Sequence, residues 1–262
     1  MYKQELNSNN EQFSLVITIK TKGEKTFRVW AEDLDKVNSK YADRVVKVNG
    51  DRKIFFSFPV SPKKLFFAVV NKDNLQDTDF EVSLIQTPLK KYNIWLDDNT
   101  KSFLKLAIPF SQVCGFENAS PQGRIFKSKD NKFTIKFFDI IKDYATGKIM
   151  NTPARIGHQS GRIEVSKVKF DKYTIPMRMA ILLHEFSHVY KNPKIDLEIS
   201  NEIGADINAL YIYLGLGFSK IDAITVYAKV FLKAQTKGNV ERMRKIMDYI
   251  NKFENEDFAF RE

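Results

Sequence analysis

The apolar residues of this chain change their spacing near residue 97. Before that point they fall in short runs rich in Val, Ile and Phe, separated by turn-forming residues, which is the pattern of β-strands. In the last third of the chain they recur every three or four residues over longer segments, which is the pattern of helices with one buried face. We therefore expect an α+β protein with its strands concentrated first and its helices last.

Residues 1–97 are expected to form an all-β domain, sandwich-like or barrel-like. Six runs of strand-forming residues lie in this part. The first two, 15–19 and 26–30, flank a Lys-Gly-Glu triplet and predict a hairpin. Polar residues at 97–99 interrupt the apolar runs, so we place the domain boundary after residue 97. This part contains no catalytic arrangement, and we interpret it as a docking or accessory module.

Residues 98–262 are expected to form a second domain, with a mixed sheet followed by helices. Three runs indicate strands, at 133–138, 154–156 and 162–166. Four segments with helical spacing follow them, at 175–191, 197–214, 219–234 and 239–253.

Charge and cysteine content narrow the classes of function. The chain has a formal net charge of +10 and a single cysteine. One cysteine excludes an internal disulfide and a multi-cysteine metal site. The lysines are scattered along the chain, so we interpret the charge as a solvated surface and predict no nucleic-acid partner. No signal peptide or membrane span is visible, so we expect a protein of the cytoplasm, or of an assembly made there.

Two of the three histidines lie in one five-residue motif, His184-Glu185-Phe186-Ser187-His188, inside a predicted helix. Residues four apart share a helix face, so both imidazoles can bind one zinc ion. Glu185 follows the first histidine and can act as the general base that takes a proton from a metal-activated water. In a chain with three histidines, chance alone produces this pattern on the order of a few times in a thousand. The alternative interpretation is two histidines in an ordinary core helix.

A catalytic zinc site needs a third protein ligand, and the next predicted helix offers three carboxylates. Glu198, Glu202 and Asp206 recur every four residues and therefore share one helix face. By spacing alone, any of the three could point at the histidines. The alternative interpretation of this pattern is an acidic stripe on the surface.

The pairing of His184-Glu185-x-x-His188 with Glu202-x-x-x-Asp206 resembles the signature of the gluzincins, the zinc metallopeptidases that include thermolysin. The resemblance covers about residues 160–215. It implies a zincin-like domain in which Glu202 is the third zinc ligand and Asp206 supports a ligand histidine from behind. The Glu-x-x-Ala-Asp form of the second motif also resembles membrane-bound prenyl-protein peptidases, whose membrane spans are not visible in this sequence.

The resemblance also implies a strand that binds substrate and a group that stabilises the oxyanion. Zincins place an edge strand before the metal helix, and an extended substrate pairs with it. Here that strand would be Arg162-Ile163-Glu164-Val165-Ser166. Thermolysin-like enzymes use a histidine after the ligands for the oxyanion, and this chain has none there. The candidates for this contact, or for a contact with substrate, are Tyr211, Tyr213, Tyr227 and His158.

We therefore expect a zinc-dependent peptidase that hydrolyses peptide bonds in a peptide or protein substrate. The alternative is a structural component of a larger assembly, such as a virion, that docks through its β domain and carries a zincin-like domain. A bias toward Lys, Asn, Ile and Phe and a weaker resemblance to metallopeptidase-like proteins of bacterial viruses favour this alternative. Turnover of a substrate would favour the enzyme, whereas a stable complex with partner proteins would favour the assembly component.

Overall fold

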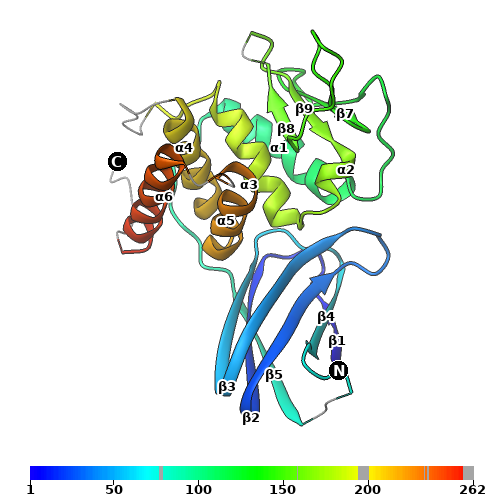
Figure 1. The fold of residues 1–262 in the computed structure, drawn as a ribbon, viewed down its shortest axis with the longest axis vertical. Coiled ribbons are helices and arrows are strands. Elements are labelled where there is room, and N and C mark those ends of the chain that lie inside the picture. The colour runs from blue at the N-terminus through cyan, green and yellow to red at the C-terminus, as the bar shows by residue number, and fades with distance from the viewer. Residues whose placement is uncertain (77–78, 158, 194–200, 233, 235, 256–262) are drawn as a thin grey trace. The chain divides into compact units, whose positions relative to one another are not determined.

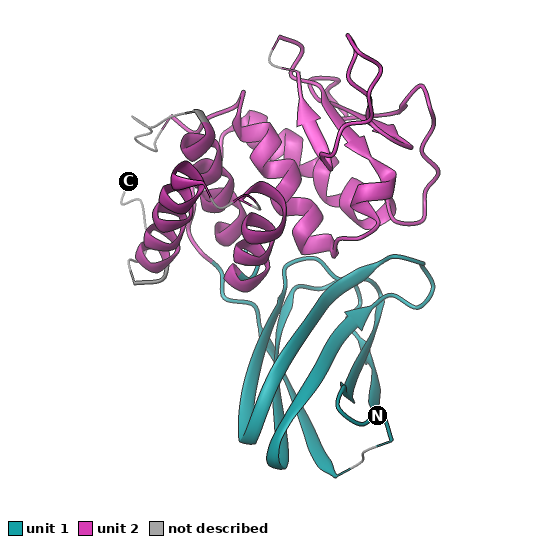
Figure 2. Cartoon of the chain, in the orientation of Figure 1, with its two compact units in different colours: residues 1–91, 217–219 teal, residues 92–216, 220–262 magenta. Residues whose placement is uncertain are grey.

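The computed structural model describes residues 1–76, 79–157, 159–193, 201–232, 234 and 236–255 (Figure 1). The chain divides into two compact units (Figure 2). Unit 1 comprises residues 1–91 with 217–219, and unit 2 comprises residues 92–216 and 220–262. The α+β class is confirmed, because unit 1 holds an antiparallel sheet and unit 2 holds a mixed sheet and helices. The division falls before the predicted boundary after residue 97, and it assigns residues 217–219 to the β unit.

Unit 1 consists of five strands in one antiparallel sheet. They are β1 (Tyr2–Asn7), β2 (Phe13–Glu32), β3 (Lys40–Phe58), β4 (Lys64–Asn71) and β5 (Phe80–Pro88). β2 pairs with β3 along its whole length, while β5 pairs with the first half of β2 and β4 with the second half. β1 pairs with the other edge of β4.

The predicted hairpin at residues 15–30 is wrong, because both runs belong to the single strand β2. Its residues alternate between buried and more exposed positions on either side of a register shift between Thr21 and Glu24. Gly23 lies in this shift with a positive φ of 76°, so the glycine forms a bulge instead of a turn. The buried face is aromatic, and Phe56 of β3 contacts Phe67 of β4 with ring centroids 6.4 Å apart. Phe56 pairs with Leu15 in the first half of β2, and β4 pairs with the second half, so both halves of β2 share one core.

The sheet of unit 2 has four short strands. They are β6 (Arg124–Lys127), β7 (Thr134–Phe138), β8 (Ala154–Ile156) and β9 (Ile163–Ser166), in the spatial order β6-β7-β9-β8. β7 and β9 are parallel, and the two other pairs are antiparallel.

The prediction that residues 162–166 form an edge strand is wrong. β9 has β7 on one side and β8 on the other, and all four of its residues are buried. The edge next to it is β8. The sequence contains both strands of this antiparallel pair, but only the parallel pairing with β7, a strand distant in sequence, decides which of them is internal.

Six α-helices and one π-helical turn are present in the described part of unit 2. They are α1 (Asp98–Val113), α2 (Lys167–Phe170), α3 (Ile175–Ser187), α4 (Asn201–Gly215), α5 (Lys220–Val226), η1 (Tyr227–Phe231) and α6 (Lys237–Asn255). The sequence did not predict α1, whose Phe103 stacks on Phe186 of α3 with ring centroids 4.2 Å apart. Among the described residues, no helix is both long and apolar enough to cross a membrane.

A buried amide joins the C-terminal end of α3 to α4. Asn208 of α4 accepts a hydrogen bond from the backbone N–H of Asn192 at 3.0 Å. Its Nδ2 donates to Ser187 Oγ at 2.7 Å and to the backbone carbonyl of Tyr190 at 3.1 Å. The carbonyl of Trp95 in turn accepts from Asn192 Nδ2 at 3.3 Å. Since Asn208 is fully buried, these bonds determine how far each helix can slide along the other.

We expect Asn208→Ala to lower the free energy of unfolding of unit 2 by about 2–4 kcal/mol, because it leaves several buried polar groups without a partner. Asn251→Ala is the matched control, since Asn251 is exposed on α6, and its effect should stay within about 0.5 kcal/mol. Denaturant unfolding followed by the fluorescence of Trp95, in a Trp30→Phe background, would report on unit 2 alone. Equal midpoints for the two variants would contradict this role of Asn208.

Candidate metal centre

Helix α3 carries the two histidines into the protein interior. All thirteen residues of α3 are buried, and its side chains are apolar except those of Arg178, His184, Glu185 and Ser187. His184 lies in the last turn, and His188 follows the helix with helical dihedral angles, φ −65° and ψ −29°. The i, i+4 relation therefore persists to His188. The two Nε2 atoms lie 3.2 Å apart.

Glu202, in the first turn of α4, brings a carboxylate to the two histidines. Its Oε2 lies 3.8 Å from His184 Nε2, and its Oε1 lies 3.7 Å from His188 Nε2. A tetrahedral ion of the size of zinc, with bonds of about 2.0–2.1 Å, holds its donor atoms about 3.3–3.4 Å apart. The observed separations are within about half an ångström of that geometry. The His184, His188 and Glu202 cluster could therefore bind a metal ion.

Asp206 lies behind His184, one turn after Glu202 on α4. Its Oδ1 is 2.9 Å from His184 Nδ1, and the carboxylate is fully buried. The two atoms are at contact distance without being aligned as donor and acceptor, and neither has another hydrogen-bond partner among the described residues. A histidine whose Nε2 binds a metal almost always donates its Nδ1–H to a carboxylate, a backbone carbonyl or water, which fixes its ring and tautomer. The orphaned pair thus fits a metal at Nε2.

Arg242 of α6 also belongs to the site, and sequence reasoning missed it. Its Nη2 lies 3.0 Å from Glu202 Oε2 and 2.8 Å from Asp206 Oδ2. Its Nε donates to the same Asp206 oxygen at 3.0 Å. Arg242 lies 36 residues after Asp206, on a helix without any recognisable motif. Only the packing of α6 against α4 reveals this contact.

Glu185 is buried beside the cluster. Burial raises the pKa of its carboxyl group, and the negative charge of Glu202 raises it further, while His184 acts in the opposite direction. A hydrogen bond with the backbone of Ile156 also acts against the increase. Ile156 is in the edge strand β8, so this bond places that edge of the sheet next to Glu185.

Two of the tyrosines proposed for the oxyanion use their hydroxyl groups elsewhere. Tyr211 donates to the carbonyl of Trp95 at 3.2 Å and accepts from its N–H at 2.8 Å. Tyr227 donates to the backbone carbonyl of Asp206 at 3.2 Å. Both side chains are buried, as is that of Tyr213, so the structure gives all three the role of core residues. His158 and Glu198 lie outside the described residues.

Four of the five residues proposed to contact substrate form β9, and Glu164 has a structural role there. The carboxylate of Glu164 accepts hydrogen bonds from Tyr144 and Arg155 and pairs with Arg162 at 3.3 Å. Burial alone would raise the pKa of Glu164, but these hydrogen bonds and charges lower it below its ordinary value. Arg155 belongs to β8, so this ion pair joins the edge strand to its neighbour.

The ring of Phe231, in the π-helical turn η1, packs on the imidazole of His184 with centroids 4.1 Å apart. A π-helical turn at such a place is typical of functional sites.

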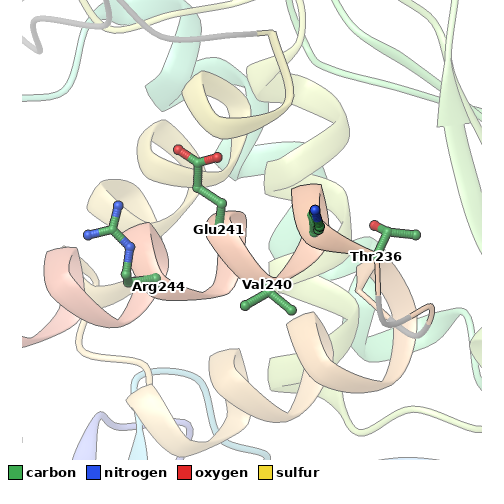
Figure 3. A pocket seen from close by; sticks show the side chains of 5 residues that line it. Thr236, Val240, Glu241 and Arg244 are labelled. Atoms are coloured by element: carbon green, nitrogen blue, oxygen red, sulfur yellow. The ribbon is translucent and has the colours of Figure 1, made fainter.

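None of the cluster residues lines the surface pocket beside α6 (Figure 3). That pocket is formed by Thr236, Lys237, Val240, Glu241 and Arg244.

The chain matches no protein-family model, and neither the curated proteins nor the solved structures include a significant match.

We expect Glu202→Ala to weaken metal affinity more than Asp206→Ala does, because the first removes a donor atom and the second removes only the support of His184. Asp206→Ala should cost roughly 10–100-fold in affinity. His184→Ala and His188→Ala should abolish stoichiometric binding. Competition with a chelator measures each affinity, and Glu241→Ala, an exposed glutamate on α6, is the matched control. A larger loss for Asp206→Ala than for Glu202→Ala would reverse the assignment of the third ligand.

Proposed function

We propose that this protein is a zinc-dependent peptidase of the gluzincin type. The observation that carries the proposal is the convergence of His184, His188 and Glu202, with Asp206 behind His184. Two imidazoles and one carboxylate are a donor set typical of catalytic zinc, which keeps one position open for water or substrate. The mixed sheet before α3, and the second ligand helix after it, support a zincin-like architecture for unit 2.

A bound zinc supplies Lewis-acid chemistry, since it lowers the pKa of water and polarises a carbonyl group. Glu185 carries the proton. Its burial favours the protonated form of the carboxyl group and therefore makes the carboxylate a stronger base than an exposed glutamate. The same oxygen that accepts a proton from water can later donate it to the leaving amine of the substrate.

The edge strand β8 is suited to hold an extended substrate. Gly157 N–H donates to the Arg162 carbonyl, and Ser166 N–H donates to the Pro153 carbonyl. In an antiparallel pair this pattern turns the backbone groups of Arg155 toward β9 and those of Ala154 and Ile156 away from it. A peptide that adds to this edge would lie beside Glu185, because the backbone of Ile156 already contacts that side chain.

The assembly component is the second candidate, and one observation in unit 1 favours it. Ile85 and Phe55 are 58% and 63% exposed, and each pairs directly with Val16 on β2. Directly paired residues share a face of the sheet, so the three side chains form an apolar row on the outer face. An exposed apolar row of this kind is typical of a protein-binding surface.

We expect Glu185→Gln to retain about one zinc per chain and to lose at least about a hundredfold in peptide hydrolysis, because the amide cannot accept a proton. Glu241→Gln is the control, since it removes an exposed carboxyl group from the same unit. The measurement combines metal analysis with turnover of an unstructured protein substrate. Undiminished turnover by Glu185→Gln would exclude the mechanism, and absence of zinc in the wild-type protein would exclude the peptidase.

A further inference from the structure

We propose that Arg242 is a positioning residue that holds Glu202 and Asp206 in the orientation required for metal binding. The proposal rests on the metal site of the proposed function, and it adds α6 to the elements that build that site. It does not require that the site hydrolyse peptides.

The guanidinium group bridges the two carboxylates from one side. It contacts Glu202 through Nη2 at 3.0 Å, and Asp206 through both Nη2 and Nε at 2.8 and 3.0 Å. The planar fork of an arginine is pre-organised for such contacts, and charge-assisted hydrogen bonds are stronger than neutral ones. The side chain of Arg242 is only 14% exposed, so water screens these interactions less than it would at the surface.

The orientation of the Glu202 side chain depends on Arg242 more than the orientation of the histidines does. The two imidazoles project from the buried end of α3, whereas the Glu202 side chain is 52% exposed and lies in the first turn of α4. A glutamate with that freedom samples many rotamers, and a metal ion would have to order it on binding. Arg242 restricts the rotamers of the Glu202 carboxylate before a metal binds, which reduces the conformational-entropy cost of metal binding.

Arg242 also orients Asp206, the carboxylate behind His184. Arg242 binds Asp206 through Oδ2 and leaves Oδ1 facing His184 Nδ1. One side chain of α6 thereby fixes both the third ligand and the carboxylate behind the first ligand. The guanidinium charge also repels a nearby cation, but it is already paired with two carboxylates. When Arg242 is removed, the two carboxylates lose their fixed orientation and the metal ion is no longer repelled by the guanidinium. We expect the first effect on metal affinity to be the larger one.

The test compares Arg242→Ala, Arg242→Lys and Arg244→Ala in the full-length protein. Arg244 is the control, because it lies on the same helix, its side chain is 64% exposed, and its ion pair with Asp248 spans 3.9 Å. Zinc affinity by chelator competition is the first readout. The visible absorption spectrum with Co²⁺ is the second, since it reports the number and symmetry of the metal ligands independently of catalysis.

We expect Arg242→Ala to weaken zinc binding by roughly 10–100-fold and to alter the Co²⁺ spectrum, with Arg244→Ala unchanged. Arg242→Lys should recover only part of the affinity, because an ammonium group restores the charge without the fork. It also serves as the decisive variant if Arg242→Ala does not fold.

Two results would overturn the proposal. Wild-type affinity in Arg242→Ala would show that Glu202 needs no support, and full recovery in Arg242→Lys would show that only charge balance matters. A wild-type protein that binds zinc but cleaves no peptide would remove the peptidase function alone, and the ranking of the variants would still decide the role of Arg242. A wild-type protein that binds no divalent metal would overturn both proposals.

Discussion

The packing of α3 against α4 is the constraint on which the rest of the metal centre depends. α3 supplies two imidazoles and α4 supplies two carboxylates, and a shift of one turn between the helices would separate them by about 5.4 Å. Asn208 prevents that shift, because its amide is hydrogen-bonded to Ser187 and to the backbone of Tyr190 and Asn192. A buried amide tolerates less sliding than an apolar contact does, since each lost hydrogen bond leaves a buried polar group without a partner.

Electrostatic balance is the second requirement of this centre. Glu202 and Asp206 place two carboxylates close together, and Asp206 is fully buried. Burial of an unpaired charge is costly, so these carboxylates require a cationic partner from the protein. Arg242 supplies that cation from α6, and the ring of His184 lies on the other side of Asp206. The separations of the three donor atoms are close to those around a tetrahedral ion.

The sheet of unit 2 contacts Glu185 through its edge strand. Its edge strand β8 is joined to β9 by the ion pair between Arg155 and Glu164, and the backbone of Ile156 contacts Glu185. Glu185 therefore lies beside both the His184, His188 and Glu202 cluster and the backbone of the edge strand β8. Unit 1 contributes none of the residues of this cluster, and it carries the exposed apolar row of Val16, Phe55 and Ile85.

The sequence by itself determined the α+β class, the helix that carries His184 and ends before His188, and the common face of Glu202 and Asp206. These features depend on periodicity within one segment, which the identities of nearby residues specify. Tertiary structure alone decided that β8 and not β9 is the edge strand, that Gly23 forms a bulge within β2, and that Tyr211 binds Trp95. It also decided that Arg242 reaches the site. Each of these depends on pairing or packing between segments far apart in the chain, and local residue spacing carries no information about such contacts.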